Sequence, residues 1–313
     1  MSDETILGRC LGGVILRCQI LCLCLGHRLS VGPTINSISV CSAPMSGAPV
    51  VAVDESLNAE DALVVTCFPS AGFVSSIVAH YLVDRLGLNF VGGARGEGLP
   101  PVCLVQDGKP LPPLRFYAGE PICHMDRCDK VVLIVSEIQV ASELCLSLTD
   151  SILDWVEAKG ASQMMMIDSY SHGPDQAHSI FDDDDSTESM LGIGSTDSAH
   201  EKLGGLEVPM LKHGVVGGMT GVMLGECRRR GVDAMAILAE SGDDLANGAI
   251  PDARAAARII GRIDGLLPAI KLDPEPLLEE AQRIEEQIRE MMAVQLNQMQ
   301  KESSGGESSA MYG

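Results

Sequence analysis

Short apolar runs alternate with amphipathic segments from about residue 48 to residue 268. Four of the runs are continuously apolar: residues 63–67 (LVVTC), 131–135 (VVLIV), 163–167 (QMMMI) and 232–239 (VDAMAILA). Continuous runs of this length are typical of strands that are covered on both faces. The alternation therefore predicts an α/β fold in which a mostly parallel or mixed sheet lies between helices.

Three segments between the runs have helical spacing of their apolar residues. They cover residues 73–86, residues 141–159 and a segment that begins at Pro251. The second is the clearest, because apolar side chains recur every three or four residues and Gly160 follows its last turn. The third has an alanine and isoleucine stripe, with arginines on the opposite face: Arg254, Arg258 and Arg262.

Two stretches lack this alternation. Asp107 and Gly108 separate VCLVQ from KPLPPLRFY, which predicts a hairpin over residues 102–117 whose prolines favour an edge or irregular strand. Residues 171–198 are polar and contain four successive aspartates, Asp182 to Asp185. They predict a solvated loop, with a weak metal site or a repulsive gatekeeper as the alternatives.

The C-terminal part is expected to be a helix followed by a tether. From Pro274 apolar residues recur at alternating four- and three-residue steps, which predicts a helix that packs on its own domain or against another subunit. Residues 301–310 (KESSGGESSA) are too polar to bury a core and are expected to be flexible, with a reach of roughly 17–19 Å. The chain then ends in Met311, Tyr312 and Gly313, which offer an apolar side chain, a phenol and a free carboxylate.

The predicted organisation has four parts. Residues 1–47 are an N-terminal extension, interpreted as a mispredicted start with Met45 as initiator, or alternatively as a membrane anchor. Residues 48–272 are the core domain, residues 273–300 the C-terminal helix, and residues 301–313 the flexible tail.

Composition excludes some partners and indicates a compartment. A formal charge of −21 argues against nucleic acid and anionic membranes, since both need basic surfaces. Four of the eleven cysteines lie in apolar runs and are expected to be buried thiols, which indicates a reducing, cytoplasmic location. They are Cys67, Cys103, Cys145 and Cys227. Cys123 and Cys128, beside His124, lack a second pair at zinc-site spacing, so no metal site is predicted there.

The glycine cluster of residues 214–221 is the main candidate for a ligand site. It precedes a predicted helix that runs to about Arg230 and contains Gly214, Gly217, Gly218 and Gly221, just after His213. Two interpretations remain: a phosphate cradle, live or degenerate, or a small-residue face that packs a helix against the sheet. His172 and His213 follow predicted strands, where α/β folds form ligand sites, and a loop or structural role is favoured for each. The carboxylates Asp168 and Glu240 also follow apolar strands, at the ordinary frequency for such folds. No nucleophile motif is present, so neither a catalytic residue nor a cofactor is predicted.

Four segments together resemble the proteasome assembly chaperone 2 family. They are residues 68–86 (FPSAGFVSSIVAHYLVDRL), 106–117 (QDGKPLPPLRFY), 213–224 (HGVVGGMTGVML) and 239–263 (AESGDDLANGAIPDARAAARIIGRI). The ending also resembles the HbYX tail of proteasome activators, with Met311 at the hydrophobic position, Tyr312 at the tyrosine and Gly313 last. Residues 1–44 have no counterpart in this resemblance.

The resemblance implies a three-layer αβα sandwich like purine nucleoside phosphorylases, with homo-oligomers whose tails dock on the α-ring of the 20S proteasome. It leaves open a homologous chaperone subunit as a further partner. We therefore predict a non-enzymatic assembly chaperone or ATP-independent activator. The rivals are a nucleoside- or nucleotide-metabolising enzyme that uses the glycine turn, and a membrane-tethered scaffold.

Overall fold

A computed structural model describes residues 48–106, 108–119, 130–171, 190–241, 251–266 and 272–279. An eight-stranded sheet runs through it in the order β1-β3-β6-β7-β2-β8-β10-β9. The strands are β1 (Val50–Val53), β2 (Leu63–Cys67), β3 (Asn89–Arg95), β6 (Leu114–Gly119), β7 (Val131–Ser136), β8 (Gln163–Tyr170), β9 (Met190–Gly194) and β10 (Ala234–Glu240). A separate hairpin consists of β4 (Leu104–Gln106) and β5 (Lys109–Leu111).

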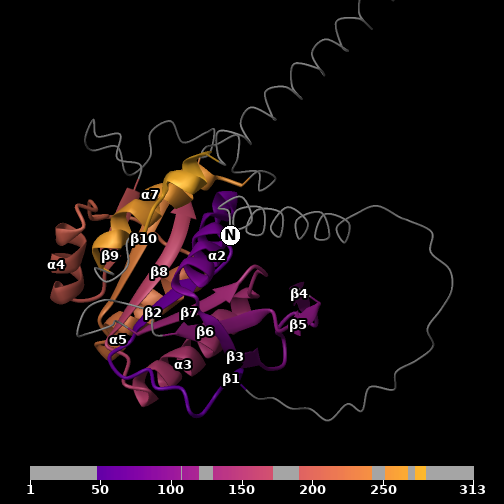
Figure 1. Ribbon diagram of the computed structural model, residues 1–313. Coiled ribbons are helices and arrows are strands. Elements are labelled where there is room, and N and C mark those ends of the chain that lie inside the picture. The colour runs from indigo at the N-terminus through magenta and orange to yellow at the C-terminus, as the bar shows by residue number, and fades with distance from the viewer. Residues whose placement is uncertain are drawn as a thin grey trace, which may run out of the picture.

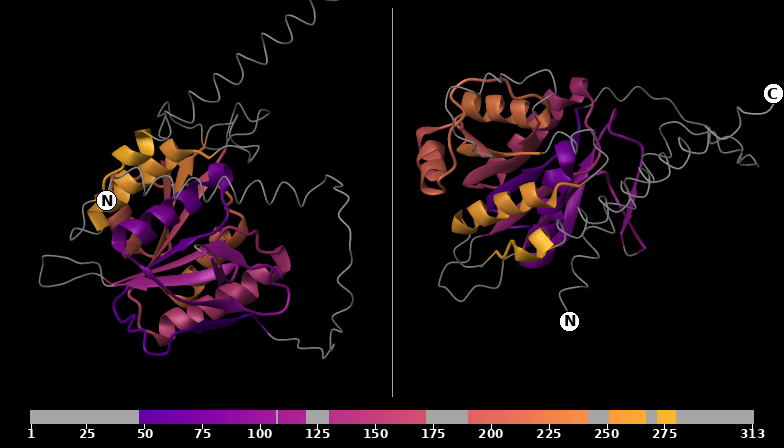
Figure 2. Two further views of the ribbon diagram at one scale, coloured as in Figure 1. Left: turned by 45° about the vertical axis from the view of Figure 1, so that its right-hand side comes forward. Right: turned by 90° about the horizontal axis from the view of Figure 1, so that it is seen from above.

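Helices cover both faces of this sheet (Figure 1). They are α2 (Val74–Leu86), α3 (Ser142–Ala158), α4 (Asp197–Gly205), α5 (Gly218–Arg230) and α7 (Ala253–Ile263), with short 3-10 turns η1 (Ala71–Phe73) and η2 (Asp264–Leu266). Buried side chains of α2 and α7 form one core with Val65, and those of α3 and α5 form the other with Val64. Figure 2 shows these layers from two further sides. The predicted α/β fold is confirmed, whereas the likeness to purine nucleoside phosphorylases stays a prediction.

The centre of the sheet is parallel and its flanks are antiparallel. β7, β2, β8 and β10 run parallel, while β1, β3 and β6 on one side and β9 on the other run antiparallel to their neighbours. All the residues of β2 and β7 are buried, as continuous apolar runs predict for strands between two helical layers. The carboxyl ends of β2, β8 and β10 consequently meet at one edge of the sheet.

Sequence patterns located the central elements well. Strands were found at all four continuous runs, and helices at all three segments with helical spacing. Gly160 follows α3 with a φ of 68°, as expected for a glycine just beyond a helix.

The predicted hairpin is confirmed in its first part, because β4 and β5 pair antiparallel across residues 107–108. It is shorter than predicted, since the chain breaks at Pro112 and Pro113 and β6 joins the main sheet. Figure 1 shows the β4–β5 hairpin projecting beyond β3 and β6. Two other expectations from the sequence were wrong. The polar stretch 171–198 is not all loop, because β9 and the start of α4 lie within it. Cys103 is exposed, whereas Cys67, Cys145 and Cys227 are buried as expected.

A buried ionic network fastens the antiparallel half to α2. Arg115 on β6 is fully buried and donates from Nη2 to Glu137 Oε1, just beyond β7. His80 Nε2 on α2 lies 2.9 Å from the same oxygen, and Arg115 Nε donates to the Tyr117 hydroxyl at 3.2 Å. These bonds satisfy a guanidinium that would otherwise be costly to bury.

The predicted boundaries at residues 47, 272 and 300 stay predictions. The N-terminal extension, most of the C-terminal helix and the tail lie outside the described residues, as do Cys123, His124, Cys128, His172 and Asp182 to Asp185. Among the helices that the structure describes, none has the length and apolar character needed to span a bilayer.

Candidate functional site

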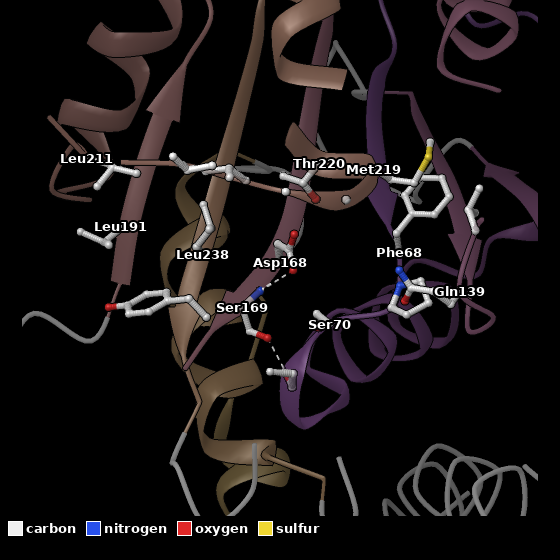
Figure 3. A pocket seen from close by; sticks show the side chains of 18 residues that line it. Phe68, Ser70, Gln139, Asp168, Ser169, Leu191, Leu211, Met219, Thr220 and Leu238 are labelled. Atoms are coloured by element: carbon white, nitrogen blue, oxygen red, sulfur yellow. Dashed lines mark hydrogen bonds between the residues drawn. The ribbon is translucent and has the colours of Figure 1, made fainter. Parts of the chain in front are cut away.

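A pocket opens at the edge of the sheet where β2, β8 and β10 end. Its volume is about 310 Å³, at the lower end of the range in which small molecules bind. Phe68 to Ala71 follow β2, Gln139 and Val140 follow β7, and the first turn of α5 forms the opposite wall. In Figure 3 the labelled side chains surround Asp168 of β8. This is where open α/β sheets bind ligands, because loops from several strands meet there.

Asp168 is the acidic group of this pocket. Its Oδ1 accepts a hydrogen bond from the Ser169 amide at 2.8 Å, and Thr220 of α5 lines the pocket on the same side (Figure 3). Burial raises the pKa of Asp168, and the bonds from Thr220 and Ser169 oppose this only in part. Within the described residues no lysine, arginine or histidine forms an ion pair with it.

The first turn of α5 lines the pocket with glycines and with the side chains of Met219 and Thr220. Gly217 is its N-cap and provides no side-chain hydrogen bond, while Gly218 has a φ of 64°, which few other residues adopt. A Cβ on Gly221 would lie 2.1 Å from the Val216 carbonyl oxygen, so the preceding loop folds closely over this turn. Gly217 and Gly218 have open space around them. Backbone amides at such a terminus favour negative charge.

The interpretation of the glycines as a helix face packed on the sheet was wrong. Gly214 and Gly217 precede α5 rather than lying on it, and Gly221 contacts the chain of Val216 instead of a strand. His213 and Gly214 are exposed and do not line the pocket. The predicted group is therefore split, since Gly217 and Gly218 line the pocket and His213 does not.

The opposite wall is a tight turn after β2. Ser70 Oγ accepts from the Ser75 amide at 3.0 Å, and Ser169 Oγ donates to the Ala71 carbonyl at 2.7 Å. Gly72 and Phe73 both have left-handed backbones, with φ of 59° and 54°. Phe73 is unusual in this conformation, so the turn is held by its surroundings.

The hydroxyls of Ser70 and Ser169 have protein partners that are not histidines, so the described part of the pocket lacks a nucleophile paired with a base. No cluster of three or more metal-ligating side chains exists in the described ranges. Tyr170 also lines the pocket, and burial together with Glu240 raises its pKa to about 12.

Sequence reasoning singled out Asp168, Gly217 and Gly218 but missed Phe68, Ser70 and Gln139. Each of these three comes shortly after an apolar run that was correctly identified as a strand. Their position was therefore a usable signal, because residues that follow parallel strands gather at one edge.

The second candidate site, Met311, Tyr312 and Gly313, lies outside the described residues. The structure does describe residues 272–279, where the predicted C-terminal helix begins. The Tyr81 hydroxyl of α2 donates to the Asp273 carbonyl at 2.8 Å and accepts from the Asp273 amide at 3.0 Å. Residues 275–279 are helical, and Leu277 is buried in the α2–α7 core.

A family model matches residues 64–292, most of the chain. The chain belongs to the PAC2 family. An uncharacterized protein of Methanocaldococcus jannaschii is 26% identical over 242 residues, which are 77% of this chain and 90% of that protein. No function is therefore available from this relative.

Solved structures give the family a biochemical context. Pyrococcus furiosus PbaA, an archaeal homolog of proteasome-assembly chaperone, matches with a TM-score of 0.68 and 26% identity over 85% of this chain and 100% of its own. P. furiosus PbaB, an archaeal proteasome activator, matches with a TM-score of 0.62 over 78% of this chain and 99% of its own. At 19% identity the likeness to PbaB shows the shared fold alone.

Proposed function

We propose that this protein is a non-enzymatic proteasome assembly chaperone or ATP-independent activator. Its C-terminal residues dock into pockets between neighbouring α-subunits of the 20S particle. The observation that carries the proposal is the pairing of a PAC2-family body with a chain end of the HbYX type, Met311, Tyr312 and Gly313. The resemblance of the body to PbaA supports the same class of partner.

The chemistry of the last three residues suits a socket between two subunits. Met311 supplies apolar area, the Tyr312 ring supplies more area and a hydroxyl, and the Gly313 carboxylate supplies a charge that a lysine or arginine can pair with. Non-covalent binding favours the α-ring arrangement that presents the complete socket. It does so because a ligand moves the equilibrium between two states only if its affinities for them differ.

The body supports this role by fixing the start of the C-terminal segment. Asp273 is bonded to Tyr81 through both backbone groups, and the Asp264 carboxylate accepts from the Leu272 amide at 2.6 Å. Leu277 then buries its side chain beside α2 and α7. A segment that leaves the body from a fixed point restricts the volume that its free end explores, which raises the effective concentration of that end at a nearby socket.

The deciding experiment measures binding of the full chain to isolated archaeal α-subunits and to finished 20S particles. Tyr312→Ala and deletion of residues 311–313 are expected to abolish capture and any stimulation of peptide hydrolysis. Ser309→Ala, in the same polar segment, is the matched control and should bind as the unaltered chain does. Tyr312→Phe keeps the ring and removes only the hydroxyl, so it measures the part played by that hydrogen bond.

The two particle forms separate the two roles. Capture of free α-subunits with faster ring formation indicates an assembly chaperone, and stimulation of finished particles indicates an activator. Retained binding by Tyr312→Ala, with circular dichroism and melting temperature unchanged, would falsify tail docking. Light scattering on the same samples tests the proposed homo-oligomer.

A further inference from the structure

The pocket around Asp168 has a chemical imbalance that the tail-docking role does not use. A carboxylate has about four lone-pair positions, and the Ser169 amide occupies one of them. Asp168 is partly buried, and its carboxylate borders a cavity of about 310 Å³. No lysine, arginine or histidine of the described residues forms an ion pair with this carboxylate, so it can accept from a cationic ligand in the cavity.

The rest of the lining restricts which cationic ligand fits the pocket. Apart from Asp168, much of the wall is apolar, with Phe68, Val140, Leu191, Leu211 and Leu238 facing the space. Figure 3 shows Leu191, Leu211 and Leu238 on one side of Asp168 and Phe68 on the other. A bare metal ion would find a single carboxylate there, which is too few ligands for tight binding. A ligand with one compact cationic head and a short apolar body fits both features.

We propose that this pocket binds a small apolar molecule through a primary ammonium group that pairs with Asp168. An ammonium is a compact charge with three donors, which suits the carboxylate positions that the Ser169 amide leaves open. Its binding offsets the penalty that burial places on the Asp168 charge.

Two sources carry this group: an apolar amine and an apolar α-amino acid. Only the amino acid has a carboxylate. The first turn of α5, which has no side-chain cap, lines the same pocket as Asp168 and favours a negative group there. L-leucine, 3-methylbutylamine and 4-methylpentanoate share a branched apolar body and distinguish the sources. If only leucine binds, or if leucine binds more tightly than 3-methylbutylamine, the pocket is an amino acid site. If the two bind with equal affinity, it is an amine site.

The assay uses the full chain with methionine methyl groups labelled with ¹³C, because Met219 lines the pocket. The Met219 signal, assigned with Met219→Leu, is expected to shift in a saturable way with leucine, the amine or both, and not with the acid. Asp168→Asn keeps the shape and one accepting oxygen for the Ser169 amide, so it should fold and weaken binding at least about tenfold through loss of the charge. Asp197→Asn, an exposed first-turn carboxylate of α4, is the matched control and should leave binding unchanged.

Leu191→Phe provides a test that does not depend on Asp168, because it narrows the cavity from the apolar side and should also weaken binding. Binding of the acid as strong as that of leucine, equal affinity in Asp168→Asn, or no shift with any of the three compounds overturns the proposal. Tyr312→Ala should bind the ligand normally, so the pocket and the tail are tested separately.

Discussion

The ion pair between Arg115 and Glu137 is the contact whose loss we expect to destabilise this fold most. The side chains of Arg115 and Glu137 are 0% and 9% exposed, so water screens the pair little. Glu137→Gln leaves the guanidinium buried without its counter-charge. Breaking a buried pair from one side costs about 3–5 kcal/mol, and we expect the free energy of unfolding to fall by that amount.

Replacing both partners removes the ion pair without leaving one of its charges buried and unpaired. In the variant with Arg115→Met and Glu137→Leu no buried charge remains, and the residual cost comes from His80 and Tyr117, which each lose a hydrogen-bond partner. At about 1 kcal/mol for each bond, the double variant should lose only about 2 kcal/mol, less than Glu137→Gln alone.

Urea unfolding, followed through the fluorescence of Trp155, measures these differences. Trp155 is the sole tryptophan of the chain, and its ring centroid lies 5.2 Å from that of Phe116. Glu226→Gln is the control, because its partner Arg229 is 65% exposed and the free energy of unfolding should hardly change. A loss below about 1 kcal/mol for Glu137→Gln, at an unchanged m-value, would refute the reasoning.

Three further predictions follow from individual contacts. Burial alone would raise the pKa of Glu137, but the hydrogen bond with His80 and the charge of Arg115 hold it well below its ordinary value of 4.5. The stability that this depressed pKa provides is present above pH 4.5 and is lost as the pH falls further. In urea titrations below pH 4.5, the difference in free energy of unfolding between the unaltered chain and Glu137→Gln should therefore become smaller. Gly221→Ala should lower the melting temperature, because its Cβ would lie 2.1 Å from a backbone oxygen, whereas Gly225→Ala in the same helix meets nothing within 4 Å and should raise stability by up to about 1 kcal/mol. Tyr81→Phe removes both bonds to the backbone of residue 273, so limited proteolysis should cut near that residue sooner, with unchanged cleavage counting against a tethering role.

The parallel centre of the fold could be predicted from the sequence because each central strand has a pattern that is visible within its own residues. A strand between two helical layers buries both faces, so β2 and β7 are unbroken apolar runs with no need to know their neighbours. β3 (NFVGGAR) was not predicted from the sequence, because several of its residues are exposed or partly exposed and its pairing with β6 shifts register between Phe90 and Gly92. Such a strand has neither continuous apolarity nor clean alternation.

The candidate site was only partly predictable, because its walls come from segments far apart in the chain. The glycine cluster correctly indicated the start of a helix, but three- and four-residue spacing also suggested a packed helix face. What decides between them is the left-handed backbone of Gly218 and the closeness of Gly221 to Val216, and neither is visible in the spacing. Ser70 and Gln139 meet Asp168 only because β2, β7 and β8 are parallel neighbours.

If several proposed tails of one oligomer dock together, the affinity for the 20S particle depends on the number of intact tails more steeply than it would for tails that dock singly. A three-residue plug offers little area, so strong binding requires several tails of one oligomer acting together, which improves avidity by about 10²–10⁴. Oligomers reassembled from unaltered and Tyr312→Ala subunits should therefore lose affinity for the 20S particle more steeply than the fraction of intact tails falls. Affinity that declines in simple proportion to that fraction would mean that each tail binds alone, and the body would then contribute nothing beyond carrying it.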